Sequence, residues 1–116
     1  MGKRNRGVGR ISAATTEYRD ADGNVLELRG SMSPLTRRKY ASTLHDQRRT
    51  TDDSWQRAVE FLFERLAERW TIHDVPTEGQ KELLQRYRIA GADERRWIRD
   101  VLREHLAANF PDVEAP

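Results

Sequence analysis

One segment with strongly segregated polarity, residues 53–70, constrains the fold more than any other part of this chain. Its large apolar residues recur mostly three or four positions apart, and charged residues fill many of the positions between them. That spacing places the apolar side chains on one face of an α-helix. The members of this stripe are Trp55, Val59, Leu62, Phe63, Leu66 and Trp70. We therefore expect a helix over residues 53–70 that needs a second apolar surface to cover it.

The composition limits how large that second surface can be. Of the 116 residues, 36% are hydrophobic and 34% are charged, and a chain of this length fits one small domain with a single core. No run approaches the roughly 20 apolar residues of a membrane span, and no apolar run of a secretory signal follows the basic start. Cysteine is absent, which excludes disulfides and thiol catalysis and is compatible with the cytoplasm.

Positive charge is concentrated in the first part of the chain. Residues 1–49 hold 11 Lys and Arg against 5 Asp and Glu, a net charge of +6, whereas residues 50–116 hold 10 against 14, a net charge of −4. Residues 1–14 are rich in Gly and basic residues, so we expect a disordered basic arm there. A single domain over 15–110 and a short acidic tail over 111–116 complete the predicted organisation.

A β-hairpin is predicted over residues 15–30. Asp22-Gly23 favours a tight turn, and the alternation after it places Leu26 and Leu28 on one face of a strand. A lone hairpin is marginal in water, so it must pack on helices or add to the sheet of a partner. Its free edge leaves homo-oligomerisation by strand addition open.

Helix-start residues divide the rest of the domain. Ser33-Pro34 is typical of a helix N-terminus, Thr77 to Gln80 matches a capping box, and Asp93 is placed to cap the last helix. The predicted helices cover about 34–46, 53–70, 78–89 and 93–108. We therefore predict an α+β fold, mostly helical, in which an N-terminal β-hairpin packs on a bundle of about four short helices.

Titratable residues do not converge in the pattern of a catalytic or metal site. His45 and His73 each precede an Asp, and His105 lies on an apolar stripe, where we interpret it as a hydrogen-bonded residue at the core boundary. The chain has no paired-histidine metal motif, nucleophile elbow or phosphate loop. Paired arginines such as Arg95-Arg96 are interpreted as solubilising. We expect no enzyme activity, no cofactor and no metal.

Large aromatic residues after position 54 are candidates both for the core and for a partner-binding surface. Phe61 falls off the apolar stripe of its helix and is expected to be an exposed contact. The candidate partner-binding residues are Trp55, Phe61, Phe63, Trp70 and Trp97.

The order of these features points to a family. A hairpin is followed by Arg29-Gly30-Ser31-Met32-Ser33-Pro34 and a helix, and a later helix leads into a pattern carried by Leu66, Trp70 and Ile72, then a turn with Asp74 and Pro76. Over about residues 15–110 this arrangement resembles the small tail assembly chaperones of long-tailed phages and prophages. The resemblance implies a non-enzymatic protein of the host-cell cytoplasm that binds the tape measure protein and helps tail tube subunits polymerise around it.

A small nucleic-acid-binding protein is the alternative, with no membrane partner in either case. Basic side chains early in the chain would contact phosphates. The basic arm has no aromatic residue among its basic residues on which a base could stack. The residues concerned are Lys3, Arg4, Arg6, Arg10, Arg37, Arg38 and Lys39.

Overall fold

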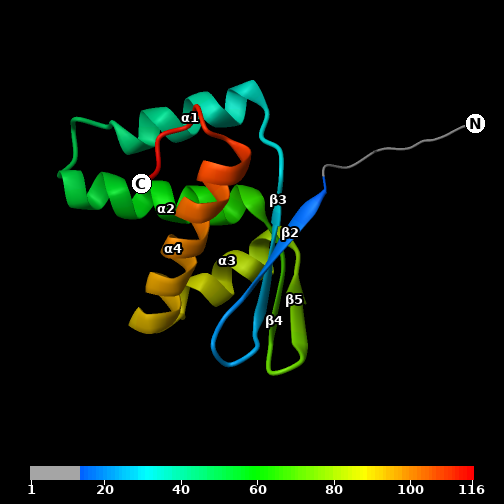
Figure 1. Ribbon diagram of the computed structural model, residues 1–116. Helices are drawn as coiled ribbons and strands as arrows, with labels where there is room; N and C mark the ends of the chain where they lie inside the picture. The colour runs from blue at the N-terminus through cyan, green and yellow to red at the C-terminus, as the bar shows by residue number, and fades with distance from the viewer. Residues whose placement is uncertain (1–13) are drawn as a thin grey trace, which may run out of the picture.

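Two hairpins of this chain join side by side into one antiparallel sheet (Figure 1). The computed structural model describes residues 14–116. The strands, in their order across the sheet, are β2 (Thr15–Arg19), β3 (Val25–Arg29), β4 (Ala67–Ile72) and β5 (Val75–Glu78). Helices α1 (Pro34–Leu44) and α2 (Thr51–Leu66) connect β3 to β4, and α3 (Gln80–Arg88) and α4 (Ala92–Asn109) follow β5. The predicted α+β class, with an N-terminal hairpin against helices, is confirmed.

The first hairpin forms as its sequence predicts. The carboxylate of Asp20 accepts hydrogen bonds from the backbone N–H groups of Asp22 and Asn24, both at 2.9 Å. Gly23 has a φ of +83°, which glycine adopts without a steric penalty. Tyr18 then stands opposite Leu26 in the register of the two strands.

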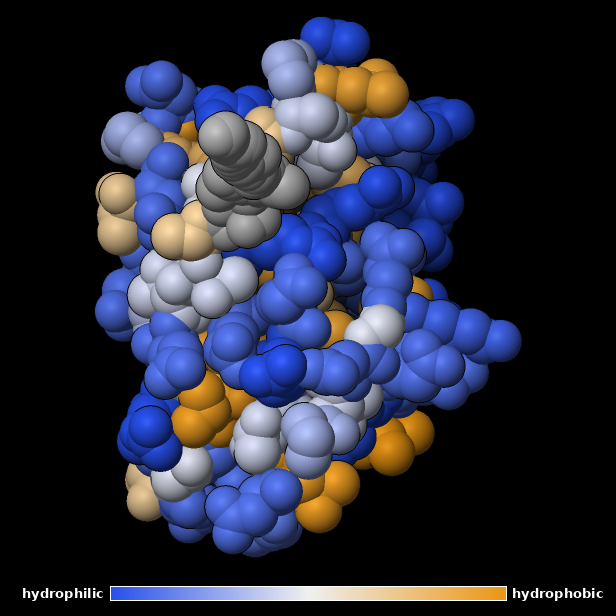
Figure 2. Space-filling model, turned by 90° about the vertical axis from the view of Figure 1, so that its right-hand side faces the viewer, coloured by the Kyte–Doolittle hydropathy of each residue, from blue (hydrophilic) through white to orange (hydrophobic). Residues whose placement is uncertain are grey.

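The two faces of the sheet differ in polarity. Leu26, Leu28 and Trp70 point towards the helices and are almost completely buried. On the other face Arg69 forms ion pairs with Glu27 and Glu78 on the neighbouring strands. Figure 2 shows that the side of the molecule carrying the sheet is mainly hydrophilic, with small, separated hydrophobic patches. The sheet therefore contributes to the core through one face only.

Helix α2 is the centre of the core. Its apolar stripe lies against α1 on one side and against α3 and α4 on another. Its N-cap is Thr50, whose Oγ1 accepts a hydrogen bond from the N–H of Asp53 at 3.1 Å. In α1 the expected cap is present, because Ser33 Oγ accepts from the N–H of Thr36 at 3.1 Å. Within the described part of the chain, no helix is long and apolar enough to cross a membrane.

The helix expected over 53–70 is too long at its C-terminal end. Helix α2 ends at Leu66, and the chain continues directly into β4. Glu68 is an extra residue in this strand, because Leu28 pairs with Ala67 while Glu27 pairs with Arg69. Such a β-bulge places Ala67 and Trp70 on the same face although they are three residues apart. The spacing of the buried residues in this strand is therefore the same as that expected on one face of a helix.

Two further helix starts differ from the prediction. Thr77 and Glu78 belong to β5, so the expected capping box does not form, and α3 begins at Gln80 after Gly79. The last helix begins at Ala92, with Gly91 rather than Asp93 as its N-cap. Glu94 Oε1 accepts from the N–H of Gly91 at 3.2 Å.

The C-terminal residues lie against α1 (Figure 1). The Tyr40 hydroxyl donates to the carbonyl oxygen of Glu114 at 2.6 Å, and His45 Nε2 lies 2.9 Å from the carboxylate of Glu114. Val113 is half-buried against the core and Pro116 is buried. Residues 111–116 thus cover part of α1.

Candidate partner-binding groove

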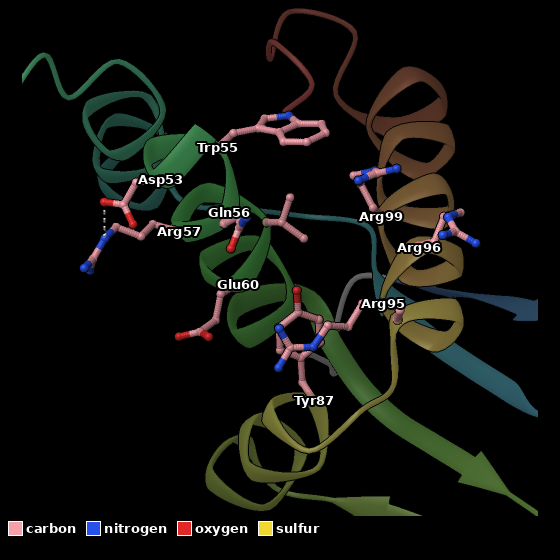
Figure 3. A pocket seen from close by; sticks show the side chains of 11 residues that line it. Asp53, Trp55, Gln56, Arg57, Glu60, Tyr87, Arg95, Arg96 and Arg99 are labelled. Carbon is pink, nitrogen blue, oxygen red and sulfur yellow. Dashed lines mark hydrogen bonds and ion pairs between the residues drawn. The ribbon is translucent and has the colours of Figure 1, made fainter. Parts of the chain in front are cut away.

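A groove with a volume of about 520 Å³ runs between α2 and α4 and reaches the end of α3 (Figure 3). Trp55 and Val59 come from α2, Tyr87 comes from α3, and Arg95 and Arg99 come from α4. Residues four apart on a helix share a face, so the Trp55–Val59 and Arg95–Arg99 spacings bring both pairs to the groove. The remaining lining residues are Asp53, Gln56, Arg57, Glu60, Ala92 and Arg96.

Two arginines of α4 point across the groove at aromatic rings of the opposite wall. The Cζ of Arg99 lies 4.8 Å from the ring centroid of Trp55, and the Cζ of Arg95 lies 5.1 Å from that of Tyr87. These distances are within the range of cation–π attraction. Stacking on a ring holds a guanidinium in place and leaves its N–H edge available to an acceptor.

Neither of these guanidiniums has a carboxylate partner within residues 14–116. Arg95 Nη2 donates to the backbone carbonyl of Arg88 at 2.7 Å. Arg99 Nε is buried and has no hydrogen-bond partner in the described residues. A buried donor without an acceptor is unfavourable, so a ligand that accepts from Arg99 would be stabilised.

The other charged residues of the groove are already neutralised. Asp53 pairs with Arg57 at 3.0 Å, and Glu60 accepts from Arg88 on α3 at 2.8 Å. In Figure 3 the Asp53–Arg57 pair points away from α4. The groove therefore has a net positive charge, which is located on its α4 side.

The phenol of Tyr87 is neutral in this setting. Burial raises the pKa of its hydroxyl, and the charge of Arg95 opposes that rise. Tyr87 also stacks on Phe63, with ring centroids 4.9 Å apart. Tyr87 lies between the core and Arg95 and forms the end of the groove at α3.

The structure separates the five aromatic candidates. Trp55 lines the groove, and Trp97 is half-buried against the core without lining it. Phe63 and Trp70 are completely buried in contact with each other, with ring centroids 5.8 Å apart. A surface role for these two is therefore wrong, because they form the core between α2 and β4.

Phe61 is half-buried rather than exposed. Its ring lies 6.4 Å from that of Tyr40, measured between centroids, and Arg65 covers it with its Cζ at 5.1 Å. The expectation that Phe61 is a free contact is corrected by this packing between α1 and α2.

The basic candidates of the nucleic-acid alternative do not gather at the groove. Arg37 lies over the ring of Phe110, with its Cζ 5.3 Å from the ring centroid, and Arg38 and Lys39 are exposed on α1. Lys3, Arg4, Arg6 and Arg10 lie outside the described residues.

The histidines are separate from one another and from the groove. His105 is hydrogen-bonded, as expected, with Tyr18 Oη at 2.8 Å from Nδ1 and the carbonyl of Arg29 at 2.7 Å from Nε2, but it is fully buried rather than at the core boundary. His73 lies in the turn between β4 and β5, with a φ of +50°. Among residues 14–116, no three His, Asp or Glu side chains are grouped so that they could hold a metal ion.

Sequence reasoning identified Trp55 but missed Tyr87, Arg95 and Arg99. From the sequence the arginine pairs are interpreted as solubilising, because acidic residues are interspersed among them. The one-turn spacing of Arg95 and Arg99 was the available indication, since it places both on a single strip beside the apolar stripe of the last helix.

Comparisons of this chain with known protein families, with curated proteins and with solved structures find no significant match.

Proposed function

We propose that this chain is a non-enzymatic tail assembly chaperone of a phage or prophage. In this role it binds the tape measure protein in the host-cell cytoplasm and aids assembly of the tail tube. The resemblance carried by Leu66, Trp70 and Ile72 supports this proposal, together with the groove between α2 and α4.

The residues that carry the resemblance have structural roles in this fold. Leu66 and Trp70 are buried, and Ile72 is half-buried opposite Val75 in the second hairpin. They support a similarity of fold and do not themselves provide a binding surface. A client must therefore bind elsewhere.

The observation that carries the proposal is the composition of the groove walls. A half-buried Trp55 and an apolar Val59 stand opposite Arg95 and Arg99, which have no carboxylate partner in the described chain. A groove between two helices accepts a third, amphipathic helix by burying its apolar face. A long helical client such as a tape measure protein would present many such faces.

The test is co-expression of this chain with the tape measure protein encoded in the same genome. We expect the two to co-purify, and we expect the client to be more soluble in the presence of this chain than alone. If the client is equally insoluble with and without the chain and none is recovered with it, the proposal is wrong.

A matched pair of tryptophan variants assigns the interaction to the groove. Trp55→Ala removes the aromatic wall, and the loss of a buried Trp anchor at an interface weakens binding by about 2 kcal/mol or more. Trp97→Ala removes a second half-buried Trp that does not line the groove. Client recovery should fall for Trp55→Ala and stay near the wild-type level for Trp97→Ala, once both are shown to be folded by circular dichroism.

A further inference from the structure

We infer that the groove recognises an acidic helical segment of the client, whose carboxylates pair with Arg95 and Arg99. This inference rests on the proposed chaperone function and adds the chemistry of the segment that is bound. The inference is supported by the geometry of the groove and by the net positive charge of its α4 side.

The first step is the spacing of the two arginines. They are four residues apart on α4, which corresponds to about 6 Å along the helix axis. Carboxylates four residues apart on a client helix have the same repeat. A helix lying along the groove can thus present one carboxylate to each guanidinium while its apolar side chains contact Trp55 and Val59.

The second step is that the guanidiniums are held ready for an acceptor. Arg99 is stacked on Trp55, Arg95 is stacked on Tyr87 and tethered to the carbonyl of Arg88. Side chains that are already ordered lose less conformational freedom on binding. The buried Nε of Arg99 also gains the acceptor that it lacks among the described residues.

The third step distinguishes an acidic helix from a nucleic acid. The groove has an apolar wall as well as a charged one, because Trp55 and Val59 stand opposite Arg95 and Arg99. A phosphate backbone is charged along its whole length and gains nothing from the apolar wall, whereas a segment with two carboxylates on one side and apolar residues on the other matches both walls. The composition of the groove therefore favours a protein segment.

The experiment uses the full chain and three synthetic helical peptides of about 20 residues, a length at which several helical turns form. The peptides share one apolar face and differ only at two positions one turn apart, which are both Glu, both Gln or both Lys. Fluorescence anisotropy gives each dissociation constant. We expect the Glu peptide to bind about tenfold or more tightly than the Gln peptide, and the Lys peptide to bind most weakly.

Charge-reversal variants locate the effect. In Arg95→Glu and Arg99→Glu the preference for the Glu peptide should be lost, and in the double variant the Lys peptide should become the preferred ligand. Lys81→Glu is the matched control, because it makes the same change in net charge at an exposed site on α3 that does not line the groove. It should leave the preference for the Glu peptide intact.

Three results of the peptide and DNA measurements would overturn the inference. The Glu and Gln peptides could bind equally well, Lys81→Glu could weaken binding as much as Arg99→Glu, or a short DNA duplex could bind the groove more tightly than the Glu peptide.

The proposed function has a separate readout, which is co-purification with the tape measure protein. If the tape measure protein still co-purifies at the wild-type level with the double variant, the groove assignment fails and the chaperone function stands. If the Glu peptide binds but the tape measure protein does not, the chaperone function fails and the groove assignment stands.

Discussion

At the scale of single residues, His105 fastens α4 to the first hairpin. Its Nε2 lies 2.7 Å from the carbonyl oxygen of Arg29, and a carbonyl only accepts, so Nε2 carries the proton. Asn109 Nδ2, a donor, lies 3.2 Å from Nδ1, so Nδ1 is an acceptor and also accepts from the hydroxyl of Tyr18 at 2.8 Å. One fully buried side chain thus satisfies polar groups on two strands.

Replacing His105 with Leu should lower the free energy of unfolding by about 2–3 kcal/mol, because the carbonyl of Arg29 and the hydroxyl of Tyr18 both lose their partner. His105→Gln retains an N–H donor that can reach the carbonyl of Arg29, and should lose about 1 kcal/mol less. Urea unfolding followed by circular dichroism measures both values. Equal destabilisation by Leu and Gln would show that shape, and not hydrogen bonding, is what this position requires.

Asp46, in the loop between α1 and α2, provides a test in acid. A hydrogen bond from the side chain of Arg48, with Nε at 3.0 Å, and another from its backbone N–H lower the pKa of Asp46 to about 2. Since this value is below the ordinary pKa of about 4, the stabilisation is present above about pH 4 and is lost as the pH falls through about 2. Asp46→Asn should be less stable than the wild type near neutral pH and approach it as the pH falls from about 4 to about 2.

An NMR titration of the Asp46 carboxyl carbon checks the same prediction directly. The midpoint should lie near pH 2 in the folded protein. A midpoint near the ordinary value would mean that the contacts with Arg48 do not persist in solution.

At the scale of elements, strand β4 shows what sequence patterns could and could not predict. The Leu66–Trp70 spacing fits a helix, and the bulge at Glu68 keeps Ala67 and Trp70 on the same face, so the pattern of buried residues gave no warning of a strand. The β-branched Thr71 and Ile72 favour a strand, but two residues are too few to outweigh a helical stripe. The first hairpin was predictable because its turn residues and its alternation agree.

Gly79 controls the junction between β5 and α3. Its φ is +92° and its ψ is 133°, a conformation that other residues rarely adopt, and an added Cβ would lie 2.7 Å from Oε1 of Glu82. Gly79→Ala should therefore lower the free energy of unfolding by about 1–3 kcal/mol. Thermal unfolding followed by circular dichroism gives the comparison.

Gly91 is the matched control for this substitution. It precedes α4 as Gly79 precedes α3, but its φ is −74° and an added Cβ would meet nothing within 4 Å. Gly91→Ala should change the stability by no more than about 0.5 kcal/mol. If both alanine variants lose the same stability, the positive φ of Gly79 is not what makes its replacement unfavourable.

At the scale of the whole molecule, sequence reasoning predicted the class of fold and named one residue of the groove, Trp55, among its candidates. The stripes of α2 and α4 have a clear helical period, so their burial could be predicted. The groove depends on how α4 crosses α2 and on which arginines lack a carboxylate, and both are properties of the tertiary structure. For the same reason the packing of residues 111–116 on α1 could not be predicted, because a segment of six residues has no period to analyse.

That C-terminal segment leads to the last prediction. Tyr40 is almost completely buried, burial raises the pKa of its hydroxyl, and the hydroxyl donates to the carbonyl of Glu114. Deleting residues 113–116 removes this acceptor together with the apolar contacts of Val113 and Pro116. We expect a loss of about 2–3 kcal/mol in the free energy of unfolding.

A Tyr40→Phe background separates the two causes of that loss. The substitution removes the hydroxyl, so the deletion no longer leaves a buried donor without a partner, and only the apolar contacts are lost. The deletion should therefore be about 1 kcal/mol less destabilising in Tyr40→Phe than in the wild type. Urea unfolding of the four proteins gives this coupling. Strict additivity would mean that water replaces Glu114 as the acceptor at no cost, and that the tail stabilises α1 through apolar contact alone.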